Sequence, residues 1–131
     1  MATLRVIGDA LDPDTVSQLL GGAPTRSCRK GDALPGSETG KLNIAKTGTW
    51  RMRAIRREPE DLNAQIMEIL GQLTQELSVW SALRSRFRVD MFCGIFMAGG
   101  NDGLPLSAEV LLALGQRGID LNLDIHDASE D

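Results

Sequence analysis

Strict alternation of apolar and polar residues over positions 119–126 is the pattern that most constrains how this chain folds. Consecutive side chains of a β-strand point to opposite faces of a sheet, so this pattern predicts a strand with one apolar and one polar face. The polar face would carry Asp120, Asn122, Asp124 and His126. Such a strand is half-buried, with a core on one side and solvent on the other.

Strand and helix patterns follow one another along the rest of the chain. Alternating or β-branched stretches predict strands, and apolar residues spaced by three or four predict helices. We expect further strands at 3–7, 24–30, 49–55 and 88–97, and helices at 13–20, 58–73, 77–87 and 107–118. The two central helices are expected to be separate, because Thr74 and Ser78 suit helix caps better than helix interiors.

The resulting order, β-α-β-β-α-(α)-β-α-β, predicts an α+β fold. Its mixture of hairpin and crossover connections favours a single mixed or antiparallel sheet with helices packed on it. A length of 131 residues is typical of one domain, so we expect a single α+β domain over residues 1–131.

The strand at 49–55 has two chemically different faces. Trp50 points to one side, and Arg51 and Arg53 point to the other. Trp50 is therefore expected in the core, where Trp80 would join it from a helical stripe. The opposite face of this strand would be mostly basic.

Charge is distributed unevenly along the chain. Residues 26–57 hold nine basic and two acidic residues, a net charge of +7, whereas the rest carries −11. This asymmetry is typical either of a surface for acidic partners or of opposite charges that meet within the fold. The candidate binding residues are Arg51, Arg53, Arg56 and Arg57. Since only Trp50 lies near them as a stacking aromatic, and on the other strand face, we expect a protein partner rather than nucleic acid.

Few residues suited to catalysis are present. The chain has one histidine and no tyrosine, and it contains no phosphate-binding loop or metal-ligand spacing. Asp124 and His126 share a strand face and so suggest a metal or acid–base pair, but two ligands do not complete a site. We therefore predict no enzymatic activity, no cofactor and no bound metal.

The two cysteines are expected to be free thiols. The beginning of the sequence has no secretory signal pattern, which favours a cytoplasmic protein, and no apolar run is long enough to span a membrane. Cys28 lies among basic residues that would favour a thiolate, but a nucleophile also needs a base and only His126 is available. Cys93 lies on an apolar strand and is expected in the core.

The sequence resembles a bacterial family catalogued as domain of unknown function 4279. The resemblance covers nearly the whole chain and rests on short motifs: Gly8-Asp9-Ala10-Leu11-Asp12-Pro13, Leu20-Gly21, Pro24-Thr25, Lys30-Gly31-Asp32, Gly48-Thr49-Trp50, Leu106-Ser107-Ala108-Glu109, Leu114-Gly115 and Leu123-Asp124-Ile125-His126. It implies a small α+β domain and brings no established reaction. Some small bacterial domains of this kind act as immunity-type binding proteins, by analogy only.

Taken together, these patterns favour a non-enzymatic protein-interaction domain, and the resemblance adds an immunity-type role as one form of it, by analogy only. The alternative is a small-molecule or anion-binding domain that uses the basic strand and the 31–48 loop. The partner would be another protein or a second copy of this chain. Self-association would bury apolar residues of the last strand or of the 88–97 strand, where Phe92 and Phe96 face away from the other apolar positions.

Overall fold

The computed structural model describes residues 1–34, 43–97 and 103–126 of the chain. Five strands form one sheet in the order β2-β5-β1-β6-β7. Their bounds are Ala2–Gly8 for β1, Arg26–Cys28 for β2, Gly48–Arg53 for β5, Arg88–Phe96 for β6 and Asp120–His126 for β7. β6 and β7 are parallel, and the other neighbours are antiparallel. The mixed sheet confirms the predicted α+β fold.

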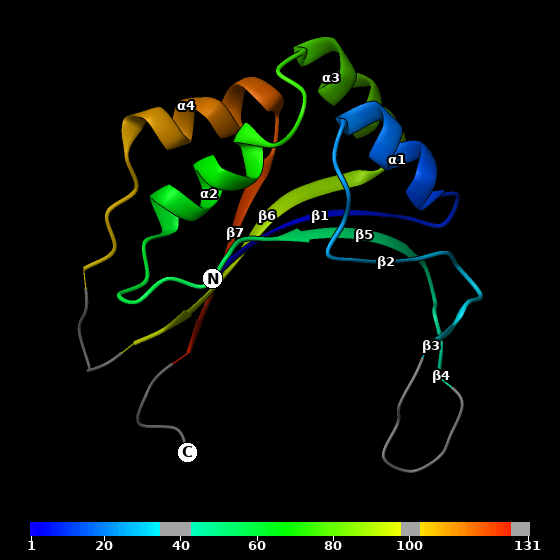
Figure 1. Cartoon of the computed structure of the whole chain (residues 1–131), viewed down its shortest axis with the longest axis horizontal. Helices are drawn as coiled ribbons and strands as arrows, with labels where there is room; N and C mark the ends of the chain where they lie inside the picture. Colours follow the sequence, from blue (N-terminus) through cyan, green and yellow to red (C-terminus); the bar gives the residue numbers. More distant parts are fainter. Residues whose placement is uncertain (35–42, 98–102, 127–131) are drawn as a thin grey trace.

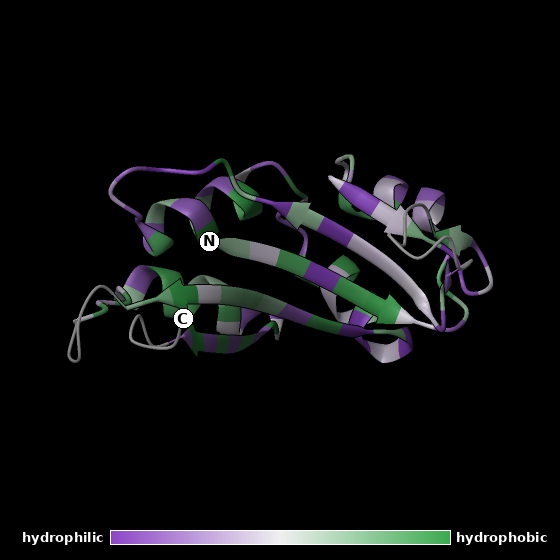
Figure 2. Ribbon diagram, turned by 90° about the horizontal axis from the view of Figure 1, so that it is seen from below, coloured by the Kyte–Doolittle hydropathy of each residue, from purple (hydrophilic) through white to green (hydrophobic). Residues whose placement is uncertain are grey.

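All the helices that the structure describes lie on one side of this sheet (Figure 1). They are α1 (Pro13–Leu20), α2 (Leu62–Gly71), α3 (Leu77–Arg86) and α4 (Ala108–Arg117). The sheet arches, with its concave side turned away from the helices. Seen from that side, the strands lie in front and the helices behind (Figure 2).

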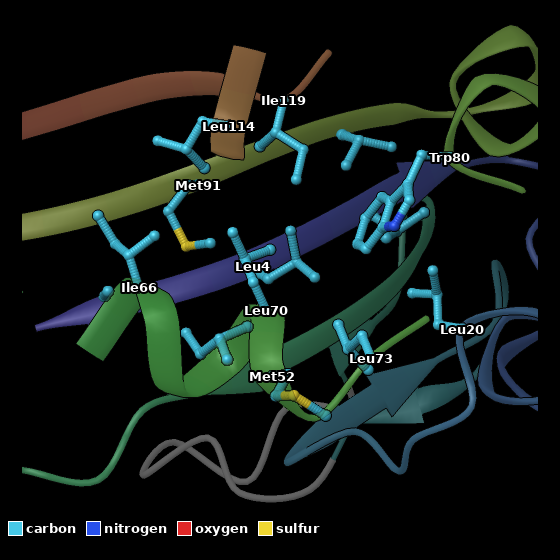
Figure 3. Close-up of a cluster of buried hydrophobic side chains, with 14 of the residues drawn as sticks. Leu4, Leu20, Met52, Ile66, Leu70, Leu73, Trp80, Met91, Leu114 and Ile119 are labelled. Atoms are coloured by element: carbon cyan, nitrogen blue, oxygen red, sulfur yellow. The ribbon is translucent and has the colours of Figure 1, made fainter. Parts of the chain in front are cut away.

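The core fills the space between the helices and the sheet. Alternate strand residues such as Leu4, Met52 and Met91 point toward Ile66 and Leu70 of α2 (Figure 3). Both tryptophans have no exposed surface, as predicted. A buried indole N–H needs a hydrogen-bond acceptor, and both tryptophans have one. Trp50 Nε1 donates to Ser17 Oγ and Trp80 Nε1 donates to the Thr74 carbonyl, each at 3.0 Å.

The predicted break between the two central helices is confirmed. α2 ends at Gly71 and α3 begins at Leu77. In the connection, the Thr74 side chain accepts a hydrogen bond from the Glu76 N–H at 3.2 Å. A short polar side chain that competes with the backbone in this way favours a turn over a continuous helix.

The start of α2 differs from the prediction. Residues 58–61 do not form its first turn, because the Asp61 side chain caps the helix by accepting from the Ala64 N–H at 3.1 Å. This places Leu62 as the first helical residue. The predicted 31–48 loop contains two short strands, β3 (Ala33–Leu34) and β4 (Asn43–Ile44), which pair with each other; its residues 35–42 lie outside the described part.

Strand β6 is covered on one face only by the described chain. Val89, Met91 and Cys93 are buried beneath the helices. Phe92 is half-buried on the other side, and Phe96 is 76% exposed there. The two apolar faces predicted for this strand therefore have different environments, and the exposed one belongs to the concave side.

Candidate binding face of the sheet

The concave side of the sheet, here called the open face, holds the polar positions of the strands. It contains a hollow of about 680 Å³ whose lining includes Arg26, Arg51 and Arg53 at one end and Phe92, Phe96 and His126 at the other. Arg51 and Arg53 alternate with buried Trp50 and Met52, which fixes their direction. The structure thus places two of the predicted binding residues on this face.

A row of five charged residues crosses the open face at a single level of the sheet. The strand register sets Arg26 opposite Arg51, Arg51 opposite Arg5, Arg5 opposite Asp90 and Asp90 opposite Asp120. Three basic residues are therefore followed by two acidic residues from β2 to β7. We call this set the charged row.

The centre of the charged row is neutralised internally. Arg5 Nε donates to Asp90 Oδ1 at 2.8 Å, and Arg5 Nη2 donates to Asp90 Oδ2 at 2.5 Å. These hydrogen bonds raise the pKa of the Arg5 guanidinium. The Arg5 guanidinium also lies 4.5 Å from the ring centre of Phe92. Arg5 is thus held in place by its own chain.

The basic end of the face has no such compensation within the described residues. Arg26, Arg51 and Arg53 are exposed and make no ion pair with any residue that the structure describes. Like charges directly opposite each other on neighbouring strands are destabilising. Arg26 and Arg51 have this arrangement. An anionic partner would relieve their repulsion.

The other two predicted binding residues point elsewhere. Arg57 Nη2 donates to Glu68 Oε1 of α2 at 3.0 Å, and Arg56 Nη2 lies 3.3 Å from Glu58 Oε1. Neither lines the hollow. The four arginines predicted as one site are therefore divided into a facing pair, Arg51 and Arg53, and a pair already engaged with carboxylates.

Opposite charges do meet within the fold at the edge near β2. Arg29 Nη2 donates to Asp12 Oδ1 at 2.7 Å, which lowers the pKa of the Asp12 carboxyl, and Lys30 Nζ lies 3.3 Å from Asp9 Oδ2. Part of the sequence asymmetry is thus neutralised locally. Within the remainder, Arg26, Arg51 and Arg53 lie together on one surface.

The far end of the hollow contains the only histidine. His126 Nε2 lies 3.0 Å from Asp124 Oδ2, and the His126 ring stacks on Phe96 with centroids 4.8 Å apart. Within the described ranges no group of three or more His, Cys, Asp or Glu side chains comes together. Asp124 and His126 therefore contact each other as expected, and together with Phe96 they form an exposed end of the sheet.

Both cysteines are free thiols in different settings. Cys28 is half-buried, with its Sγ 3.3 Å from Thr49 Oγ1. His126, its only candidate base, lies on β7 at the opposite edge of the sheet. Cys93 is fully buried, as predicted, and burial raises the pKa of its thiol to about 11. The structure therefore separates the Cys28 thiol from its candidate base.

Sequence reasoning missed Arg26 and Arg5 as members of this surface. Their strands were predicted, but a single sequence does not show which strands are neighbours. The register pairs that align them with Arg51 join residues more than twenty positions apart. Only the alternation around Trp50 could be seen in advance.

These features define an α+β domain with a helix-covered convex side and an open, charge-divided concave side. The chain belongs to the family described as a domain of unknown function, DUF4279, whose model matches residues 1–128. No curated protein and no solved structure gives a significant match. None of the helices in the described residues has the length and apolar character needed to cross a membrane.

Proposed function

We propose that this domain is a non-enzymatic protein-interaction module whose open face binds an acidic surface of a partner protein. The observation that carries the proposal is the group formed by Arg26, Arg51 and Arg53. These side chains project from two adjacent strands into one hollow, without a carboxylate partner in the described chain. Planar guanidinium groups suit bidentate contact with Asp and Glu side chains.

The shape and composition of the face favour a protein as the occupant. A twisted, uncovered sheet offers a broad surface, and its aromatic residues lie at the end opposite to the arginines. Interfaces between proteins are enriched in arginine and aromatic residues. An immunity-type role, in which the domain covers an acidic surface of a toxin, is one form of this function.

The test compares two variants of equal net charge. Protein immobilised through one terminus captures partners from a lysate of the source organism, and the captured protein is identified and purified. Its association rate is then measured with wild type and two triple variants. The face variant is Arg26→Gln/Arg51→Gln/Arg53→Gln, and the control is Lys46→Gln/Arg56→Gln/Arg57→Gln.

We expect the face variant to associate about tenfold or more slowly at low ionic strength, because electrostatic steering acts mainly on the association rate. Raising the salt concentration should reduce the wild-type rate toward that of the variant. The control should resemble wild type. Equal slowing by both variants would show that net charge alone matters, and unchanged rates for both would exclude the open face.

A second candidate function is the binding of a small anionic molecule in the hollow. Its volume of about 680 Å³ falls in the range of ligand sites, roughly 300–1,000 Å³, and its lining includes both arginine and aromatic side chains. The 31–48 loop, expected to take part, contributes none of its described residues to the lining. Saturable calorimetric binding of small carboxylates or phosphates, lost in the face variant, would favour this function over the first.

A further inference from the structure

The outer edge of β7 offers a second surface, separate from the open face. β7 is the last strand in the sheet order, with β6 on one side only. It runs over Asp120–His126, and no described residue hydrogen bonds to its outer edge. Strand edges with unpaired backbone groups are templates for pairing with another strand.

The direction of the backbone groups identifies which residues form this edge. The His126 carbonyl accepts from the Met97 N–H at 3.0 Å, so it points toward β6. Backbone groups alternate in direction along a strand. The N–H and C=O groups of Leu121, Leu123 and Ile125 therefore point outward.

The side chains of the same residues are incompletely covered. They share the helix side of the sheet, but Leu123 is 38% exposed and Ile125 is 56% exposed. Natural edge strands usually avoid a combination of apolar side chains and free backbone groups. On this edge the charged residues project to the open face instead, so they do not block approach in the plane of the sheet.

We propose that β7 pairs in antiparallel fashion with β7 of a second copy of this chain, about a two-fold axis at Leu123. In this register Leu123 lies opposite Leu123, and Leu121 lies opposite Ile125. On the other face Asp120 lies opposite His126, and Asn122 lies opposite Asp124. The two copies then share one continuous sheet, and each pair of apolar edge residues exchanges both backbone hydrogen bonds.

Charge complementarity selects this register over its neighbours. In such a two-fold pairing, residues that lie opposite each other must point to the same face of the sheet. An axis between two residues would pair residues of opposite faces, so the axis must pass through a residue. An axis at Asn122 would place Asp120 opposite Asp124, and an axis at Asp124 would place that carboxylate opposite itself. Axes at Leu121 and Ile125 also keep the carboxylates apart, but each pairs only three residues of β7 with the second copy. The axis at Leu123 keeps the carboxylates apart and pairs the whole of Asp120–His126.

Disulfide trapping tests both the dimer and its register. In a Cys28→Ser background, Leu123→Cys places one thiol opposite its own copy. Hydrogen-bonded antiparallel pairs have Cα atoms about 5.5 Å apart, which suits a disulfide. We expect Leu123→Cys to form a cross-linked dimer under mild oxidation. Leu121→Cys and Ile125→Cys should each remain largely uncross-linked alone but cross-link when mixed.

Light scattering over a concentration series supplies the independent measurement. Wild type should approach dimer mass, and Leu123→Lys should raise the dimer dissociation constant at least tenfold by placing two ammonium groups at the axis. Ile55→Lys, at an apolar residue that is 72% exposed and lies away from β7, is the matched control and should keep wild-type behaviour. Circular dichroism establishes that each variant is folded.

Two results would overturn the proposal. One is that wild type is monomeric at every concentration and Leu123→Cys forms no cross-link. This result would overturn the proposal even if the β7 edge accepts a strand from a different protein. The other is a dimer that neither cross-links through Leu123→Cys nor responds to Leu123→Lys, which would place the contact on another surface. If Leu123→Lys fails to fold, the cross-linking of Leu121→Cys, Leu123→Cys and Ile125→Cys alone tests the dimer and its register.

Discussion

Replacing Asp90 by Asn tests how the open face holds its central charges. The Arg5 and Asp90 side chains are only 18% and 8% exposed, and two hydrogen bonds join them. Removing one partner of a fully buried ion pair costs about 3–5 kcal/mol. Because Arg5 keeps some access to water and the amide oxygen can still accept one hydrogen bond, we expect a loss of about 2 kcal/mol.

Urea denaturation measures this loss. The midpoint should fall while the slope with urea concentration stays unchanged, since the surface exposed on unfolding is the same. A double-mutant cycle with Arg5→Gln isolates the pair from the cation–π contact with Phe92, and we expect a coupling energy of about 1–2 kcal/mol. A loss under about 0.5 kcal/mol, or a coupling near zero, would refute the argument that this pair stabilises the fold.

Asp90→Asn, which should lower stability, should strengthen the attraction of the open face for an acidic partner. With Asp90 neutral, Arg5 adds an uncompensated positive charge beside Arg51 on the open face. Association with an acidic partner should become faster at low salt even though the domain is less stable. A slower association of the folded Asp90→Asn variant would argue against an acidic partner.

Four further predictions concern the fold and its thiols. Trp50→Ala should cost about 3–5 kcal/mol in a denaturant melt, because the side chain is fully buried. Gly48→Ala should cost about 1–3 kcal/mol in the same assay, because a Cβ there would lie 2.7 Å from the Gly8 carbonyl oxygen, which is backbone that cannot easily move. In native protein a thiol-specific disulfide reagent should modify Cys28 and spare Cys93 until the chain unfolds. Since the Cys93 pKa rises from about 9.0 unfolded to about 11 folded, stability should fall as pH rises through this interval, and a Cys93→Ala variant should lack that contribution.

Local patterns predicted most of the elements of this fold. The alternation around Trp50 and in 119–126 located two strands and the direction of their faces, and the spacing of Leu and Ile located the helices. The start of α2 was misplaced because an acidic Pro-containing stretch resembles a first turn, while the actual cap is Asp61.

The candidate surface was only half predictable. Arg51 and Arg53 followed from alternation within one strand, but their separation from Arg56 and Arg57 depends on where β5 ends and on Glu68 of α2. The addition of Arg26 depends on pairing between β2 and β5. Such pairing is set by the whole fold and leaves no local signal in one sequence.

The two proposed surfaces lead to a last prediction, which rests on both proposals. A two-fold axis normal to the sheet would place both open faces of a dimer on the same side, so one dimer could contact two partner molecules. On a sensor densely coated with partner, wild type should dissociate more slowly than Leu123→Lys, because rebinding through a second site adds avidity. At sparse coating the two should dissociate alike, and the Arg26→Gln/Arg51→Gln/Arg53→Gln variant should keep the wild-type dimer mass. If wild type and Leu123→Lys dissociate from the partner at equal rates at both coatings, the two surfaces do not act together. If the Arg26→Gln/Arg51→Gln/Arg53→Gln variant is monomeric, the dimer contact includes the open face as well as the β7 edge.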